Sequence, residues 1–193
     1  MVMFAESEVI HEKLLRAASK TAAPAILAID GRCGSGKSTL GKMWAEEWNA
    51  DLFHMDDFYL QPHQRTDERL KEPGGNVDRE RFLHEVLLPL KAGQPIVYRR
   101  FDCGTFTFDP PKSISPKRIA IIEGSYACHP ALRNYYDLRI FLDIDPEAQI
   151  ERIEKRNGPE ALKRFQSIWI PLEETYFREC EVRECCDLIL KTA

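Results

Sequence analysis

The stretch AILAIDGRCGSGKST, residues 25–39, does most to predict the fold of this chain. An apolar run, Ala25 to Ile29, leads into Gly31-Arg-Cys-Gly-Ser-Gly36-Lys37-Ser38, which matches G-x-x-x-x-G-K-[S/T] at every fixed position. A helical pattern begins at Lys37. Strand, glycine-rich loop and helix in this order are typical of a phosphate-binding loop, so the sequence predicts nucleotide binding rather than a chance glycine-rich turn.

Each part of this loop has a chemical reason. Glycines let successive backbone N–H groups turn toward an anion, and the N-terminus of the following helix adds a positive dipole. We expect Lys37 to bridge the β- and γ-phosphates of ATP and the Ser38 hydroxyl to ligate Mg²⁺. The expected ATP-binding residues of the loop are Gly31, Gly34, Ser35, Gly36, Lys37, Ser38 and Thr39.

Outside the loop, short apolar runs alternate with helical patterns, which predicts a parallel sheet with helices on both faces. The expected strands are 25–29, 51–55, 119–122, 138–142 and 187–190, and the expected helices 6–20, 37–49, 79–91, 145–157 and 159–180. Asp145-Pro146-Glu147 indicates a helix start, and Pro171 should kink or restart the last helix. The sequence thus predicts an α/β P-loop NTPase fold with a five-stranded parallel sheet, in one domain over residues 1–193.

Residues 61–118 form an excursion between the second and third strands. Its first part, 61–76, is polar and rich in proline and glycine, and we interpret it as a mobile loop. Pro95 to Arg100 and Thr105 to Phe108 are expected to pair as a hairpin turned at Cys103-Gly104. Since the core does not need this excursion, we interpret it as substrate-binding.

Two acidic segments stand where strands end. Asp56 and Asp57 follow the second strand, at the edge where doubly wound sheets bind ligands. A carboxylate there can accept the proton of an attacking hydroxyl, although a capping or turn aspartate is the alternative. Successive strand side chains point to opposite faces, so only one of the two should face the acceptor. The other is left to bind a magnesium water, cap the turn or pair with an arginine.

Glu123 and Gly124 end the third strand. A carboxylate in this place is expected to position magnesium or its water, and the glycine would allow close approach of the backbone. An ordinary polar strand end is the alternative. Farther along, Arg152 and Arg156 are four residues apart on one helical face and could clamp the transferring phosphoryl group. Surface pairing with Glu151 or Glu154 is the alternative for them.

Composition narrows the partners. Hydrophobic residues make up 44% and charged residues 30% of the chain, and the net charge of −4 gives no basic field for nucleic acid or an anionic membrane. The first 20 residues lack the features of a signal peptide, and no apolar run is long enough to span a membrane. The six cysteines show neither a C-x-x-C pair nor zinc spacing, which favours reduced thiols in a cytoplasmic protein.

With these residues in place, the chain resembles the uridine kinase and phosphoribulokinase branch of P-loop kinases, from Ile26 to about Leu190. The Tyr98–Cys103 and Glu123–Pro130 segments look like a bacterial uridine kinase-like subgroup, although Arg99 stands where the family has a second aspartate. The segments that carry the resemblance are GRCGSGKST at 31–39, Asp56-Asp-Phe-Tyr59, Val77-Asp78, Pro95-Ile-Val-Tyr98, Ile122-Glu-Gly124 and Cys186-Asp-Leu-Ile-Leu190.

The resemblance implies roles for particular residues. It selects Asp56 as the catalytic base and adds Lys37 and Arg156 to the catalytic set. Residues 152–165 become a short lid in which Arg152 contacts ATP. Ser38 and Glu123 become the metal-binding residues. The substrate-binding residues that it implies are Asp57, Asp78, Tyr98 and Arg100.

The expected function is transfer of the ATP γ-phosphate to a hydroxyl of a small-molecule acceptor, with Mg²⁺ as cofactor. A nucleoside such as uridine or cytidine is the first choice, and a nicotinamide riboside-like or pantothenate-like alcohol is the second. A regulatory P-loop ATPase is a third reading, but the N-K-x-D motif of GTPases is absent. The oligomeric state is left open, a homo-oligomer included.

Overall fold

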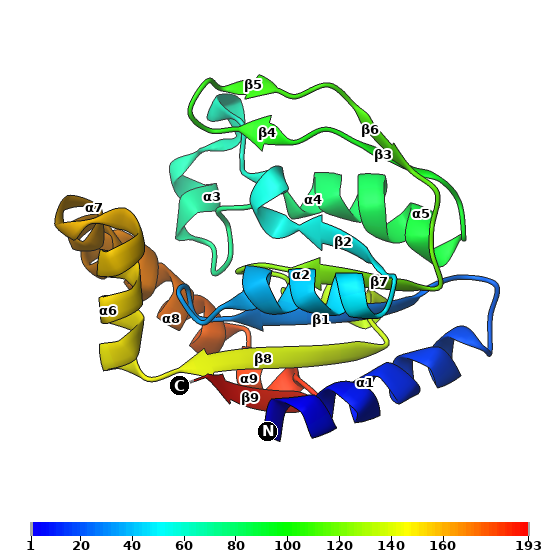
Figure 1. Ribbon diagram of the computed structural model, residues 1–193. Coiled ribbons are helices and arrows are strands. Elements are labelled where there is room, and N and C mark those ends of the chain that lie inside the picture. Colours follow the sequence, from blue (N-terminus) through cyan, green and yellow to red (C-terminus); the bar gives the residue numbers. More distant parts are fainter. Residues whose placement is uncertain (1, 193) are drawn as a thin grey trace.

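A computed structural model describes residues 2–192, with side chains from residue 6 on. At its centre lies a five-stranded sheet in the order β2-β7-β1-β8-β9, with every neighbouring pair parallel (Figure 1). The predicted α/β fold with a five-stranded parallel sheet is therefore confirmed. The strands are β1 (Ala25–Gly31), β2 (Asp51–His54), β7 (Ile119–Glu123), β8 (Leu138–Ile144) and β9 (Leu188–Thr192).

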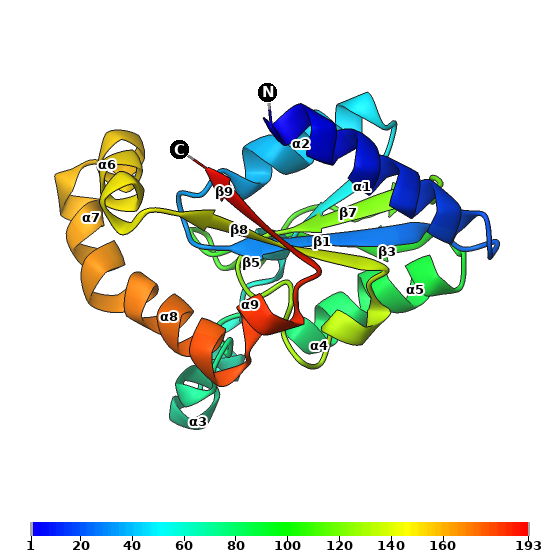
Figure 2. The same ribbon diagram turned by 90° about the horizontal axis from the view of Figure 1, so that it is seen from below.

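Helices cover both faces of this sheet (Figure 2). One face carries α1 (Val2–Ala18) and α2 (Lys37–Glu47), and the other carries α4 (Arg79–Phe82), α5 (Leu88–Lys91), α8 (Ile170–Glu179) and α9 (Val182–Cys185). A π-helical turn, Leu83–Leu87, joins α4 to α5. All of β1 is buried, because it has a strand on each side and a helix layer on each face.

The helices after β8 form an arm beside the sheet (Figure 1). They are α6 (Pro146–Asn157), α7 (Pro159–Arg164), a π-helical turn at Phe165–Trp169, and α8. The Asp145 side chain caps α6 by accepting a hydrogen bond from the Glu147 N–H at 3.0 Å. Pro171 lies in the first turn of α8, just after the π-helical turn, so the helix restarts there as expected.

The excursion forms a lobe over one edge of the sheet. Its strands are β3 (Ile96–Tyr98), which pairs with β6 (Lys112–Ile114), and β4 (Phe101–Asp102), which pairs with β5 (Thr107–Phe108). The predicted pairing of 95–100 with 105–108 is therefore wrong. The turn closes early, because Asp102 accepts hydrogen bonds from the N–H groups of Gly104 and Phe106, so 107–108 reach only 101–102.

The segment 61–76, predicted as a mobile loop, contains regular structure instead. A 3₁₀ turn at Pro62–Gln64 precedes α3 (Asp67–Lys71), whose N-cap Thr66 accepts a hydrogen bond from the Arg69 N–H. The Arg69 guanidinium then donates to the carbonyls of Gly75 and Val77 at 3.1 and 2.9 Å. These bonds fold the segment back onto the lobe.

No helix within the described part of the chain combines the length and the apolarity needed to cross a bilayer.

Candidate active site

The phosphate loop, residues 31–38, connects the end of β1 to the start of α2 (Figure 1). Gly31 has a φ of 137°, and a Cβ there would come within 2.1 Å of the Leu142 carbonyl oxygen, so only glycine fits against β8. Lys37 is 8% exposed, and its Nζ donates to the carbonyls of Gly31 and Arg32 at 2.6 and 2.9 Å. The loop's own carbonyls therefore hold the ammonium group at the loop.

Glu123 joins the loop to the neighbouring strands. Its carboxylate accepts a hydrogen bond from Ser38 Oγ at 3.0 Å and also bonds to Nδ1 of His54, its partner in the β2–β7 register. This bond raises the pKa of His54 above its ordinary value, because the carboxylate favours the charged imidazolium. A Cβ on Gly124, whose φ is 138°, would lie 2.8 Å from the Met55 Cβ, so glycine allows the close approach expected there.

The donor set at Ser38 and Glu123 fits a magnesium ion. A hydroxyl and a carboxylate are hard oxygen donors of the kind that Mg²⁺ prefers. No three acidic, histidine or cysteine side chains between residues 6 and 192 are grouped so that they could hold a metal by themselves. An ion that keeps several waters and binds partly through substrate phosphates needs no such group.

Asp56 and Asp57 lie in a 3₁₀ turn, Met55–Phe58, because β2 ends at His54. The expectation that strand alternation separates their side chains is therefore wrong, and both line the same cleft. Asp56 accepts a hydrogen bond from the Tyr59 hydroxyl at 2.9 Å. Its side chain reaches the cleft, but the surrounding walls partly desolvate the carboxylate and raise its pKa.

Asp57, in contrast, is buried and surrounded by donors. It accepts a hydrogen bond from the Tyr98 hydroxyl at 3.1 Å, and Arg100 Nε and Lys112 Nζ lie 3.6 and 4.0 Å from its carboxylate oxygens. Of the roles expected for Asp57, the structure shows pairing with an arginine. Its negative charge holds two cations at the cleft wall.

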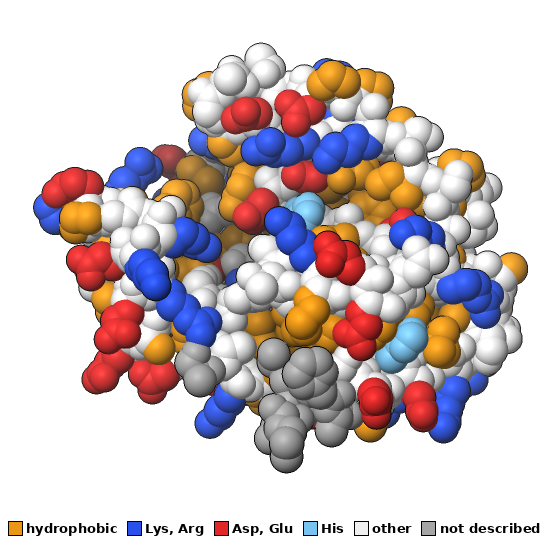
Figure 3. All heavy atoms as spheres, viewed as in Figure 1, with side chains coloured by type: hydrophobic (Ala, Val, Ile, Leu, Met, Phe, Trp, Pro, Cys, Tyr) orange, Lys and Arg blue, Asp and Glu red, His pale blue; other side chains and the backbone are white. Residues whose placement is uncertain are grey.

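A cleft of about 540 Å³ opens over these groups. Figure 3 shows basic side chains along the rim of the lobe, above a hollow that contains acidic side chains and a histidine. The cleft therefore separates the phosphate-loop side of the molecule from the lobe. Its lining residues are Ser38, Lys42, His54, Asp56, Asp57, Tyr59, Arg100, Phe101, Asp102, Cys103, Gly104, Lys112 and Glu123.

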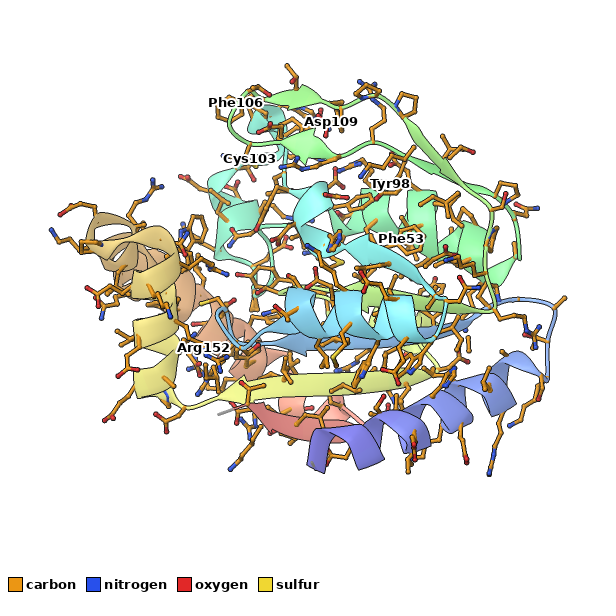
Figure 4. All side chains as sticks on the ribbon, viewed as in Figure 1. Phe53, Tyr98, Cys103, Phe106, Asp109 and Arg152 are labelled. Atoms are coloured by element: carbon orange, nitrogen blue, oxygen red, sulfur yellow. The ribbon has the colours of Figure 1, made fainter. Side chains whose placement is uncertain are left out.

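Two of the predicted substrate-binding residues, Asp78 and Tyr98, stand behind this lining. Asp78 caps α4 by accepting a hydrogen bond from the Arg81 N–H, and its other oxygen accepts from Gln64 Nε2 at 2.8 Å. Tyr98 is 3% exposed and stacks on Phe58, and Figure 4 shows it on the lobe above Phe53. Asp57 and Arg100 are the two members of the predicted set that line the cleft.

The two lid arginines have different surroundings. Arg152 lies between α6 and the phosphate loop (Figure 4), and its Nη1 donates to the Gly34 carbonyl at 3.1 Å. Arg156 is exposed at the end of α6, where its Nε donates to the Asn157 side chain at 2.7 Å. Only Arg152 is thus brought to the loop.

Sequence reasoning missed four residues that hold this site: Asp30, His54, Gln149 and Glu173. Asp30 is fully buried behind the loop, accepts hydrogen bonds from Tyr176 Oη and the Cys128 N–H, and has a raised pKa because of its burial. Asp30 could have been found in the sequence, because it is a single charged residue at the end of an apolar strand. Gln149 and Glu173 gave none, since polar residues on a helix usually face water.

Comparison with known proteins agrees with this geometry. The sequence profile of the Phosphoribulokinase / Uridine kinase family matches residues 26–158. A uridine kinase from Alkaliphilus metalliredigens is 31% identical over 156 residues, which cover 75% of this chain and 74% of that protein. A phosphoribulokinase from Synechocystis sp. is 26% identical over 152 residues, and there the chain spans only 45% of the relative's length.

A solved structure shows the same fold over nearly the whole chain. It is described as a possible uridine kinase from Bacillus stearothermophilus, and it has a TM-score of 0.71 at 23% identity. The match covers 98% of this chain and 100% of the solved one. The lobe and the arm are therefore part of a shared architecture.

Proposed function

This chain belongs to the phosphoribulokinase / uridine kinase family of P-loop kinases, and we propose that it transfers the γ-phosphate of ATP to a hydroxyl of a nucleoside such as uridine or cytidine. The strongest support for this proposed reaction is the composition of the cleft. Ser38 of the phosphate loop, the carboxylate of Asp56 and that of Glu123 line a single cleft of about 540 Å³, and the lobe forms its far wall. Donor, base and acceptor can therefore meet there.

In this proposal Asp56 is the general base. Its carboxylate reaches the cleft and is oriented by the Tyr59 hydroxyl, so it can accept the proton of an acceptor hydroxyl as that oxygen attacks. Its raised pKa makes the carboxylate a better proton acceptor than an ordinary aspartate.

Lys37 neutralises charge on the donor side. Its Nζ exchanges the carbonyls of Gly31 and Arg32 for β- and γ-phosphate oxygens, where negative charge develops during transfer. Ser38 and Glu123 would hold Mg²⁺, which when bound supplies further positive charge to the same phosphate oxygens. His54 keeps Glu123 oriented toward Ser38.

The acceptor lies against the lobe. We place Asp57 and Arg100 in direct contact with it, because both line the cleft. Asp78 supports them through Arg81, whose Nε lies 3.7 Å from Asp78 Oδ2 and whose guanidinium donates to the carbonyl of Asp57. Tyr98 supports them through its hydrogen bond to Asp57. If ribose hydroxyls are bound by these polar groups, a 2′-deoxy acceptor should lose about 1–3 kcal/mol of binding free energy, because a buried group is left unpaired.

A second candidate function is supported by the basic wall. The side chains of Arg100 and Lys112 are about half exposed in the cleft, and neither side chain donates a hydrogen bond to any described residue. Their contacts to acids are 3.6 Å or longer. Donors of this kind suit a carboxylate. A pantothenate-like alcohol, which carries one, is therefore the alternative acceptor.

The test is a coupled assay of ADP release in the presence of ATP and Mg²⁺, over nucleosides, nicotinamide riboside, pantothenate and sugar phosphates. The Lys37→Ala variant gives the background. Release that depends on uridine or cytidine supports the first candidate. Dependence on pantothenate, together with a raised KM for it in Arg100→Ala, supports the second. ADP release at the same rate without any acceptor contradicts both.

A further inference from the structure

Cys33, in the middle of the phosphate loop, has both of its backbone polar groups held by side chains from other elements. Its N–H donates to Glu173 Oε2 at 3.0 Å, and its carbonyl accepts from Gln149 Nε2 at 3.0 Å. Glu173 is on α8 and Gln149 is on α6. Both residues are buried, with Glu173 4% and Gln149 3% exposed.

Glu173 makes a second link with its other oxygen. Oε1 accepts a hydrogen bond from Ser125 Oγ at 2.6 Å. Ser125 follows Glu123 and Gly124 at the end of β7. One buried carboxylate thus ties the phosphate loop to the turn after the strand that carries the proposed magnesium acid.

Such an arrangement is expensive unless every polar atom is satisfied, because a buried carboxylate without partners strongly destabilises a fold. Here each carboxylate oxygen has a donor. Moreover, α6 and α8 are the helices on either side of α7 in the arm (Figure 1). Cys33 is therefore hydrogen-bonded to one residue before the predicted lid segment and to one residue after it.

We propose that Gln149 and Glu173 are positioning residues that hold Cys33, and through it the phosphate loop, in the conformation that nucleotide binding requires. The inference rests on the proposed function only in that the loop binds ATP and ADP. A loop that is already ordered loses less conformational freedom when phosphate arrives. Releasing Cys33 should therefore weaken nucleotide binding without touching a group that contacts the nucleotide.

The test measures ADP binding by isothermal titration calorimetry, which needs no acceptor. Glu173→Ala should weaken ADP binding by about tenfold, because the loop loses roughly the stabilisation that one hydrogen bond provides. Glu173→Gln should stay within about twofold of the wild type, because its amide oxygen can accept from the Cys33 N–H while its NH₂ donates to Ser125 Oγ. Glu173→Asp keeps the charge but has a shorter arm, and should resemble Glu173→Ala.

Two further variants separate positioning from general damage to the arm. Glu179→Ala removes an exposed acid from the same helix, whose sole ion-pair partner among the described residues is Arg178, and should leave ADP binding unchanged. The double variant Gln149→Ala/Glu173→Ala should lose less than the product of the two single losses, because the first substitution already frees Cys33. Amide hydrogen exchange over residues 31–36 should be faster in Glu173→Ala than in the wild type.

Several outcomes would overturn the proposal. They are wild-type ADP affinity in a folded Glu173→Ala, an equal loss in Glu173→Gln, an equal loss in Glu179→Ala, or multiplicative losses in the double variant. If Glu173→Ala does not fold, the proposal is tested with Glu173→Asp and Gln149→Ala, each of which should bind ADP more weakly than the wild type. A wild type that binds ADP but phosphorylates no acceptor would refute the proposed function alone, and one that binds no ADP would refute both.

Discussion

The two walls of the cleft are built on different principles. The phosphate loop stands on β1, a seven-residue strand buried along its whole length, and its backbone groups are held by buried side chains. The lobe wall stands on strands of two or three residues that pair with one another as two small sheets, outside the main sheet. Its charged groups meet at 3.6–4.0 Å. A wall made of backbone groups suits one ligand, the phosphate chain, and changes little when side chains are substituted. A wall made of side chains can be changed one residue at a time.

The largest effect should come from the phosphate-loop wall. Lys37→Ala should lower kcat by on the order of 10⁴-fold or more, because it removes the positive charge that we propose meets the transferring phosphoryl group. The fold should remain, since β1 and its neighbours do not depend on this side chain. Steady-state kinetics and a thermal melt check both points. Near wild-type turnover with any acceptor would show that the loop is not where transfer occurs.

Asp56 and Asp57 lie between the two walls, and substitutions at the two positions should have different kinetic effects. Asp56→Asn should bind ATP normally and lose roughly 10²–10⁴-fold in single-turnover rate, because the substitution removes the proposed general base. Asp57→Asn should lose less and act mainly on acceptor KM, since Asp57 orients Arg100 and Tyr98. A larger rate defect in Asp57→Asn would exchange the two roles.

The pKa of Asp56 gives this prediction a second readout. The carboxylate must be charged to accept a proton, and its raised pKa in the free protein moves the acidic limb of the kcat/KM profile above the pH at which an ordinary aspartate titrates. An acid whose pKa is higher in the folded than in the unfolded state destabilises the fold at pH values above both. At pH 7, Asp56→Asn should therefore have a Tm at or above that of the wild type, even though it is nearly inactive. A lower Tm would assign Asp56 a structural role.

Arg156 tests whether the arm takes part in the reaction. It is exposed and 2.7 Å from the Asn157 side chain, so it can act only if the arm moves. Arg156→Ala should lower turnover by roughly tenfold, less than a donor that is already in place, and leave ATP affinity nearly unchanged. Unchanged turnover would return Arg156 to the solvated surface.

The smallest effect should come from the outer surface of the lobe. The guanidinium of Arg69 lowers the pKa of Glu80 to about 2. This pair therefore stabilises the fold above the ordinary glutamate pKa, and its contribution is lost as the pH falls toward about 2. Because Glu80 is more than half exposed, Glu80→Gln should lower the free energy of unfolding at pH 7 by only about 0–1 kcal/mol. A denaturant titration at pH 7 and at pH 3 should show that even this difference shrinks in acid.

The contrast between the walls also explains what could be predicted. The strand–loop–helix unit and all five strands followed from local pattern, because buried parallel strands are apolar and the loop needs glycine where Gly31 meets β8. The β3–β6 pairing could not, since it depends on how an early turn at Asp102 shortens the β4–β5 hairpin.

The site was predictable in the same uneven way. Lys37, Ser38 and Glu123 follow strands or form a motif, and the structure brings Ser38 and Glu123 into contact. The alternation argument for Asp56 failed because β2 ends two residues before it. Glu173 is 140 residues from Cys33 in sequence, and only the folded chain brings the two together.

The lobe leaves the sheet after β2 and returns at β7, and these two strands are hydrogen-bonded neighbours. Its entry and exit are therefore separated by about one short strand length, roughly 13 Å along the sheet. A segment joined through two close ends behaves as a cassette, which can be exchanged or lengthened without moving β1 or the loop that it carries. If the lobe binds the acceptor as we propose, the fold lets acceptor preference evolve apart from nucleotide binding, and a lobe graft between relatives is the natural way to change the acceptor.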